Sequence, residues 1–143
     1  MSAPLSARLQ EIVDALPLES GMRVLEIGCG PGAAAREVAR RVENGFVLGV
    51  DRSAKAIAAA VANSKAEIAG GSLAFRTAAA EELELLDGEE PFDLAFAVRV
   101  GAFDGRHPEA GKRAKARLKT VLNRGAPLFI DGGKPLRRVP LDD

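Results

Sequence analysis

The sequence predicts a doubly wound α/β fold, in which helices cover both faces of a mostly parallel sheet. Short apolar runs alternate with segments of helical periodicity along the 143 residues. Three glycines, at positions 28, 30 and 32, directly follow the first apolar run, as in a tight turn from a buried strand into a helix. No internal repeat or low-complexity linker interrupts the alternation. We therefore expect residues 1–143 to form a single domain.

Composition limits the classes of protein to consider. A hydrophobic content of 47% is enough for one core, and the chain is short for two domains. The formal net charge of zero, with 28% charged residues, argues against disorder and against indiscriminate binding to a polyanion. Residues 1–90 carry 9 basic and 14 acidic side chains, whereas residues 91–143 carry 11 and 6. An anionic partner would therefore dock on the C-terminal third.

Cysteine usage and hydropathy indicate the compartment. Cys29 is the only cysteine, so no intrachain disulfide can form, and a reducing compartment is the default. No apolar run approaches the roughly 18 residues that a membrane span needs. We expect a cytoplasmic protein that is neither exported nor membrane-spanning.

The periodicity of apolar residues places the elements. An amphipathic helix over residues 5–16 is closed by Pro17, and Asn44-Gly45 ends the helix after the glycine turn. Ser53 is placed to cap a further helix, which Gly70-Gly71 breaks. Helices are thus expected at residues 5–16, 34–42, 54–69 and 108–122, and strands at residues 24–27, 46–51, 73–77, 92–98 and 127–131.

The sheet is expected to be truncated after strand five. Only about a dozen residues follow Asp131, and residues 136–141 can supply one strand at most. The edge of strand five would then need cover, because exposed edges carry unpaired backbone groups. Arg137-Arg138 could fold back as a short charged strand, or the edge could pair with a second chain. We expect the second arrangement, a homodimer through residues 127–141.

The glycine turn is the first candidate site. Gly28, Gly30 and Ala33 satisfy the G-x-G-x-x-G/A pattern of dinucleotide-binding proteins. Pro31 removes a backbone N–H from this loop, however, and Glu26 places a carboxylate beside it, so both residues would weaken binding of a pyrophosphate. A ligand with a cationic centre and no phosphate, such as S-adenosylmethionine, meets neither objection.

Asp51 is the second candidate. A right-handed β-α-β unit brings the carboxyl ends of the first two strands side by side, so Glu26 and Asp51 should face one crevice. A carboxylate at the end of strand two can accept two hydrogen bonds from a ribose diol. The alternative is a helix N-terminal charge ahead of Ser53, worth under about 1 kcal/mol.

The segments together resemble the class I S-adenosylmethionine-dependent methyltransferases across residues 22–131. The glycine turn, Val24 to Gly32, resembles motif I of that family, and the run from Gly49 to Ser53 resembles its post-I motif. Ala80-Glu81-Glu82-Leu83 is similar to the segment that covers the adenine. Phe92-Asp93-Leu94 opens a stretch similar to motif IV, and Leu122 to Leu128 resembles the loop before strand five.

This resemblance implies S-adenosylmethionine as the cofactor and assigns residues to it. Gly28, Gly30 and Glu26 would hold the methionine part and Asp51 the ribose. Arg52 would lie along the adenine, Ala80 would offer it a backbone N–H, and Val98 would lie beside the site at the end of strand four. The chain departs from the family at Ala79, where many relatives have an Asp that accepts from the adenine amino group.

The implied activity is methyl transfer to a small molecule. Two alternatives stay open: a non-catalytic S-adenosylmethionine-binding accessory domain and a nicotinamide-dependent oxidoreductase. Arg99, Asp104 and His107 follow strand four, where substrate contacts are expected, although a lone loop histidine is more often solvated than catalytic. No residue is assigned as catalytic, and no cluster has metal-ligand spacing.

The sequence argues against nucleic acid as a partner. Five basic residues lie in the last long helix, at positions 112, 113, 115, 117 and 119. The same helix has alanines and leucines on its inward face, so we expect the basic side chains to form its solvent-exposed face. Arg99-Val100-Gly101-Ala102 is also unlike the Pro-Pro-Tyr-type motif that nucleic-acid methyltransferases carry after strand four.

Overall fold

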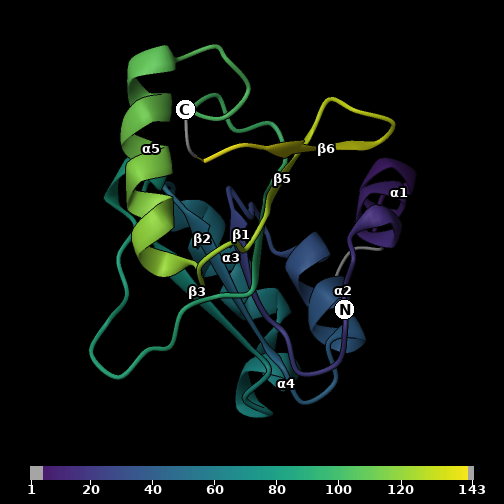
Figure 1. The fold of residues 1–143 in the computed structure, drawn as a ribbon. Coiled ribbons are helices and arrows are strands. Elements are labelled where there is room, and N and C mark those ends of the chain that lie inside the picture. Colours follow the sequence, from purple (N-terminus) through teal and green to yellow (C-terminus); the bar gives the residue numbers. More distant parts are fainter. Residues whose placement is uncertain (1–4, 142–143) are drawn as a thin grey trace.

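The computed structural model describes residues 5–141, which form a six-stranded sheet between two layers of helices (Figure 1). The elements, in chain order, are α1 (Ala7–Ala15), β1 (Arg23–Ile27), α2 (Ala33–Arg41), β2 (Phe46–Asp51), α3 (Ala54–Asn63), α4 (Lys65–Ala69), β3 (Leu73–Thr77), the 3₁₀ turn η1 (Ala80–Glu82), β4 (Leu94–Ala97), α5 (Pro108–Val121), β5 (Leu128–Asp131) and β6 (Leu136–Val139). None of the helices in this range is both long and apolar enough to cross a membrane.

The strand order is β3-β2-β1-β4-β5-β6, and every pair is parallel except β5–β6. From β1 the chain winds outward to β3 and then returns to β4, which lies on the other side of β1. The predicted doubly wound, mostly parallel sheet is confirmed. Its order reverses between β1 and β4, the position at which such sheets bind ligands.

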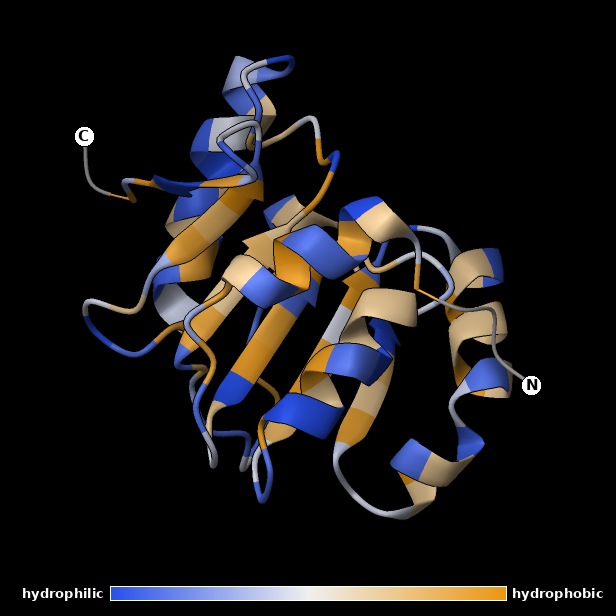
Figure 2. Cartoon of the chain, turned by 90° about the vertical axis from the view of Figure 1, so that its right-hand side faces the viewer, coloured by the Kyte–Doolittle hydropathy of each residue, from blue (hydrophilic) through white to orange (hydrophobic). Residues whose placement is uncertain are grey.

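The core consists of two apolar clusters, one on each face of the sheet. On one face, Val13 of α1 and Val38 of α2 pack against Val24 and Phe96 of the strands. On the other face, Leu118 of α5 packs with residues that include Leu25, Ile130 and Ala80. Figure 2 shows the apolar strands between helices whose outer sides are hydrophilic. Full burial of an aliphatic side chain contributes about 1.5–3 kcal/mol, so these two layers fix the position of the strand ends.

Helix ends follow the local sequence, with one difference from prediction. Ser53 caps α3, because its Oγ accepts a 3.1 Å hydrogen bond from the Ala56 N–H. The helix expected over 54–69 is divided at Ser64, whose φ of −128° is not helical. Ser64 is completely buried and its Oγ accepts a hydrogen bond from Arg36. A long-range contact therefore takes precedence over helix continuity.

The start of β4 also differs. The expected strand begins at residue 92, but Phe92 makes only an isolated bridge with Leu122, and regular pairing starts at Leu94. The intervening Asp93 is used as a connector, since its carboxylate accepts from the Arg23 N–H and from the Asn123 side chain.

The tail forms one more strand, so the sheet continues beyond strand five. Strand β6 pairs antiparallel with β5, with Leu136 opposite Asp131 and Val139 opposite Leu128. Arg137 and Arg138 are exposed on it. Of the two ways of covering the edge, the structure shows the folded-back charged strand. The edge of β5 is occupied, so the reason for expecting a dimer through residues 127–141 does not hold.

Candidate cofactor and acceptor site

A cavity of about 540 Å³ opens at the carboxyl ends of the strands, where the strand order reverses. Five of the residues predicted to bind the cofactor line it: Gly28, Asp51, Arg52, Ala80 and Val98. Arg99 and His107, expected near the substrate, line it as well. Glu26, Gly30 and Asp104 are not on its wall. The remaining wall comes from Ile27, Ala78, Ala79, Glu81, Val100, Gly101, Ala102, Arg106 and Ala110.

The glycine turn is bound to the neighbouring strand through its backbone. The N–H groups of Gly28 and Cys29 both donate to the Val50 carbonyl, at 2.8 and 3.0 Å. Gly28 has a φ of 73°, and a Cβ added there would lie 2.7 Å from Val100 Cγ2. Any other residue here would be strained by the positive φ and would require Val100 to shift.

Asp51 is held in a fixed orientation at the end of β2. Its Oδ2 accepts a 2.9 Å hydrogen bond from the Gly30 N–H, and its Oδ1 accepts one of 2.9 Å from the Ser53 N–H. A carboxylate has about four acceptor positions, so each oxygen can still take one more donor. The arrangement therefore suits a pair of adjacent hydroxyl groups in the cavity.

Glu26 lies beneath the glycine turn. The residue is 3% exposed, and its Oε1 has no hydrogen-bond partner among the described residues. Burial raises the pKa of this carboxyl well above its ordinary value, a hydrogen bond from the Ala35 backbone opposes the rise, and the Asp51 charge adds to it. Strand alternation puts Glu26 on the face that carries α2, away from the cavity wall. Its Oε1 is thus a buried carboxyl oxygen beneath the turn that makes no hydrogen bond within the described residues.

Arg36 is a residue that sequence reasoning missed. Its Nη1 donates to the Pro31 carbonyl at 2.9 Å and to Ser64 Oγ at 3.0 Å, and the residue is 7% exposed. It therefore joins the glycine turn to the junction of α3 and α4. The sequence does contain a signal for this role, because Arg36 directly follows Ala34 and Ala35, two small residues on the inward face of the same helix.

The opposite wall is the segment after β3. The Ala78 N–H donates to the Asp51 carbonyl at 2.9 Å, so this segment starts beside the end of β2. Ala80 is buried in η1. Arg117 of α5 donates from Nε to the Leu83 carbonyl at 2.7 Å and holds η1 against that helix.

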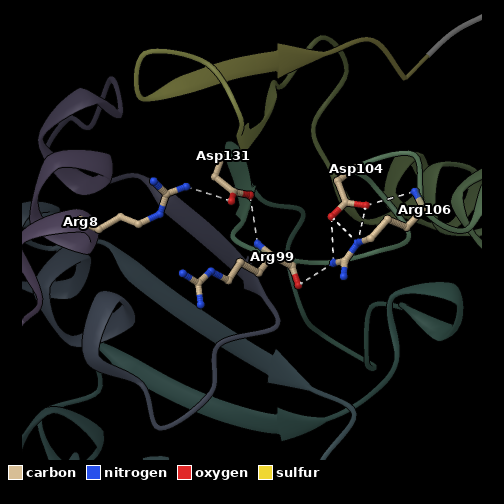
Figure 3. A network of polar contacts seen from close by, with 5 residues as sticks. All are labelled: Arg8, Arg99, Asp104, Arg106 and Asp131. Atoms are coloured by element: carbon tan, nitrogen blue, oxygen red, sulfur yellow. Dashed lines mark hydrogen bonds and ion pairs between the residues drawn. The ribbon is translucent and has the colours of Figure 1, made fainter.

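Charged side chains gather at the end of the cavity formed by the loop after β4 (Figure 3). Arg99 has a φ of 59°, a conformation that few non-glycine residues adopt. Its N–H donates to Asp131 Oδ1 at 3.0 Å, and Asp131 Oδ2 pairs with Arg8 at 3.2 Å. Arg106 pairs with Asp104 and also reaches the Arg99 carbonyl at 3.4 Å.

Within residues 5–141 no group of three or more His, Cys, Asp or Glu side chains could hold a metal ion.

Comparison with known proteins decides the family. Residues 24–125 match the model of a methyltransferase domain. The chain belongs to this methyltransferase domain family. The match confirms the family predicted from the sequence, the class I S-adenosylmethionine-dependent methyltransferases.

Relatives of this methyltransferase domain agree with the assignment. A ubiquinone biosynthesis O-methyltransferase of Rhizobium leguminosarum bv. trifolii is 43% identical over 86 residues, which are 60% of this chain and 31% of the relative. An S-adenosylmethionine-dependent methyltransferase of Mesorhizobium loti has a TM-score of 0.68 at 25% identity, over 87% of this chain and 52% of that one.

A third relative is phosphoethanolamine N-methyltransferase 2 of Haemonchus contortus, solved in complex with S-adenosyl-L-methionine. Its TM-score is 0.67 at 26% identity, over 86% of this chain and 27% of that one. The matched part of the chain spans about a third of the length of the ubiquinone biosynthesis O-methyltransferases from Rhizobium.

Proposed function

We propose that this methyltransferase domain binds S-adenosylmethionine in the cavity at the strand ends and transfers its methyl group to a small molecule. The observation that carries the proposal is the Asp51 carboxylate, which the backbone N–H groups of Gly30 and Ser53 orient beside the glycine turn. A carboxylate so oriented, with acceptor positions left over, fits the two hydroxyls of a ribose. The cofactor, when bound, supplies an electrophilic methyl group.

The other predicted residues take roles around this anchor. Gly28 lets a ligand approach the backbone. A Cβ added at Gly30 would have no protein atom within 4 Å, so the space beside this residue is open. Glu26 offers its unpartnered Oε1 to a donor from the methionine part. We assign the ribose and adenine to the wall formed by Asp51, Arg52 and Ala80, which all line the cavity.

The acceptor would enter between Val98 and the loop that follows it. Methyl transfer depends mainly on alignment of a nucleophile with the methyl group, so the residues of this wall act by positioning. The relatives in Rhizobium are named as O-methyltransferases, which supports an oxygen nucleophile. The same names favour methyl transfer over the accessory-domain and oxidoreductase alternatives.

We also propose that residues 1–143 act as one domain in the cytoplasm. Two apolar clusters pack on the two faces of one continuous sheet, and Cys29 is a free, buried thiol, as suits a reducing compartment. A homodimer would have to use a surface other than the edge of β5, because β6 occupies that edge.

Calorimetric titration of the purified chain tests the proposal. S-adenosylhomocysteine and NAD are titrated in parallel, and we expect binding of the first alone. Micromolar binding of NAD with none of S-adenosylhomocysteine would overturn the cofactor assignment.

A further inference from the structure

We propose that Arg99 binds an anionic group, such as a carboxylate, on the methyl acceptor. This inference rests on the proposed function, since it concerns the acceptor end of the same cavity. It assigns the acceptor to the class of small organic acids.

The first argument is the charge at this end of the cavity. Arg99 and Arg106 line it, together with His107. Asp104 pairs with Arg106 and Asp131 pairs with Arg8, so both acids of this cluster and the Arg106 charge are already engaged. The two carboxylates that line the cavity, Asp51 and Glu81, come from β2 and η1. Among the described residues, the positive charge of Arg99 is therefore the one that an anion at the acceptor end would meet unpaired.

The second argument is the state of the Arg99 guanidinium. Residue 99 is exposed, and no ion pair or hydrogen bond of its guanidinium occurs within the described chain. Figure 3 shows this side chain extending away from Asp131 and Asp104, whereas the Arg8 and Arg106 guanidinium groups point at those carboxylates. A guanidinium offers a planar fork of donors that matches a carboxylate with two parallel hydrogen bonds. Of the three arginines in Figure 3, Arg99 is the one whose guanidinium donors are not engaged by a carboxylate of the described residues.

The third argument is the backbone. A non-glycine residue at a φ of 59° persists where its surroundings hold it, and such residues cluster at ligand sites. Here the Asp131 carboxylate accepts from the Arg99 N–H, and Arg106 reaches the Arg99 carbonyl. Both sides of the residue are thus held, which fixes the start of its side chain at the rim of the cavity.

A matched pair of probes tests the proposal. The affinities of 4-hydroxybenzoate and its neutral counterpart 4-hydroxybenzamide are measured by ligand-observed NMR on the full chain saturated with S-adenosylhomocysteine. For the wild type we expect the acid to bind at least about tenfold more tightly than the amide. The Arg99→Gln variant should lose this preference, and Arg99→Lys should keep part of it.

A control variant completes the design. Arg124→Gln removes one exposed charge from the loop before β5, outside the cavity, and should keep the full preference. Equal affinity of the wild type for the two probes, or no binding of the acid, would overturn the proposal, as would an unchanged preference in Arg99→Gln. Affinity for S-adenosylhomocysteine is recorded for every variant, so a failure of the cofactor assignment is seen separately.

Discussion

The backbone N–H of Gly30 donates a 2.9 Å hydrogen bond to Asp51 Oδ2, which joins the turn after β1 to the end of β2. The two residues are 21 positions apart in the chain, and the parallel pairing of β1 with β2 brings them together. A single carboxylate therefore orients the glycine turn and presents acceptors to the cavity.

Replacement of Asp51 by Ala should weaken binding of S-adenosylhomocysteine by about 1.5–3 kcal/mol, the scale of hydrogen bonds to a charged group. Titration calorimetry measures the affinity. Asp87→Ala removes an exposed acid outside the cavity and serves as the control. A folded Asp51→Ala protein with wild-type affinity would refute the ribose assignment.

Gly30→Ala and Gly125→Ala form a matched pair. Both glycines have positive φ, 54° and 81°, and a Cβ at either would meet no atom within 4 Å. Each substitution should therefore lower the free energy of unfolding by a similar amount, about 1–2 kcal/mol for a left-handed residue. Only Gly30→Ala should also reduce affinity for S-adenosylhomocysteine, because its methyl group would enter the space above the turn. Equal affinities in the two variants would show that the turn is merely a connection.

The buried carboxyl of Glu26 should make the ligand-free protein less stable as the pH rises. Its pKa is raised in the folded state, so between its ordinary value of 4.5 and the folded value the native protein binds more protons than the unfolded chain. The free energy of unfolding should fall across this range, starting near pH 4.5. Urea unfolding of wild type and Glu26→Gln at several pH values isolates the effect. Parallel curves for the two proteins would contradict it.

Arg36→Met should destabilise the fold by about 2–4 kcal/mol, because it removes two hydrogen bonds from a charged donor and leaves the Pro31 carbonyl and Ser64 Oγ without them. Arg40→Met, at an exposed position of the same helix, is the control and should change stability by under about 1 kcal/mol. Chemical denaturation compares the two. If Arg36→Met were no more harmful than Arg40→Met, the link between the turn and Ser64 would have no energetic weight.

Local patterns were sufficient to predict much of this fold. The apolar run at Phe46–Asp51 marks a strand with the bounds that the structure shows, since a strand buried on both faces has a simple signature. The bounds of the edge strand Leu73–Thr77, which is only partly buried, were also predicted. The glycine spacing and Asp51 likewise led to residues that meet in space. Both signals depend on neighbours close in sequence or on the geometry of one β-α-β unit.

The rest depends on contacts between distant residues. Ser64 divides a predicted helix because Arg36, 28 positions away, reaches its hydroxyl. The tail pairs with β5, whereas the sequence led us to expect a second chain at that edge, because no local pattern distinguishes the two ways of covering it. The polar contacts around Arg99 join residues 8, 99 and 131, which no local pattern connects.

Asp131 has a further consequence for the thermodynamics of binding. It ties α1 and the loop after β4 to the end of β5 without any ligand. The conformational entropy of ordering that loop is therefore lost when the chain folds, not when an acceptor arrives. Because this rim is already ordered, a smaller part of the favourable free energy of each contact is offset by loss of conformational entropy on binding. Variants that release the loop should bind with a more unfavourable entropy, even where every contact with the bound molecule is retained.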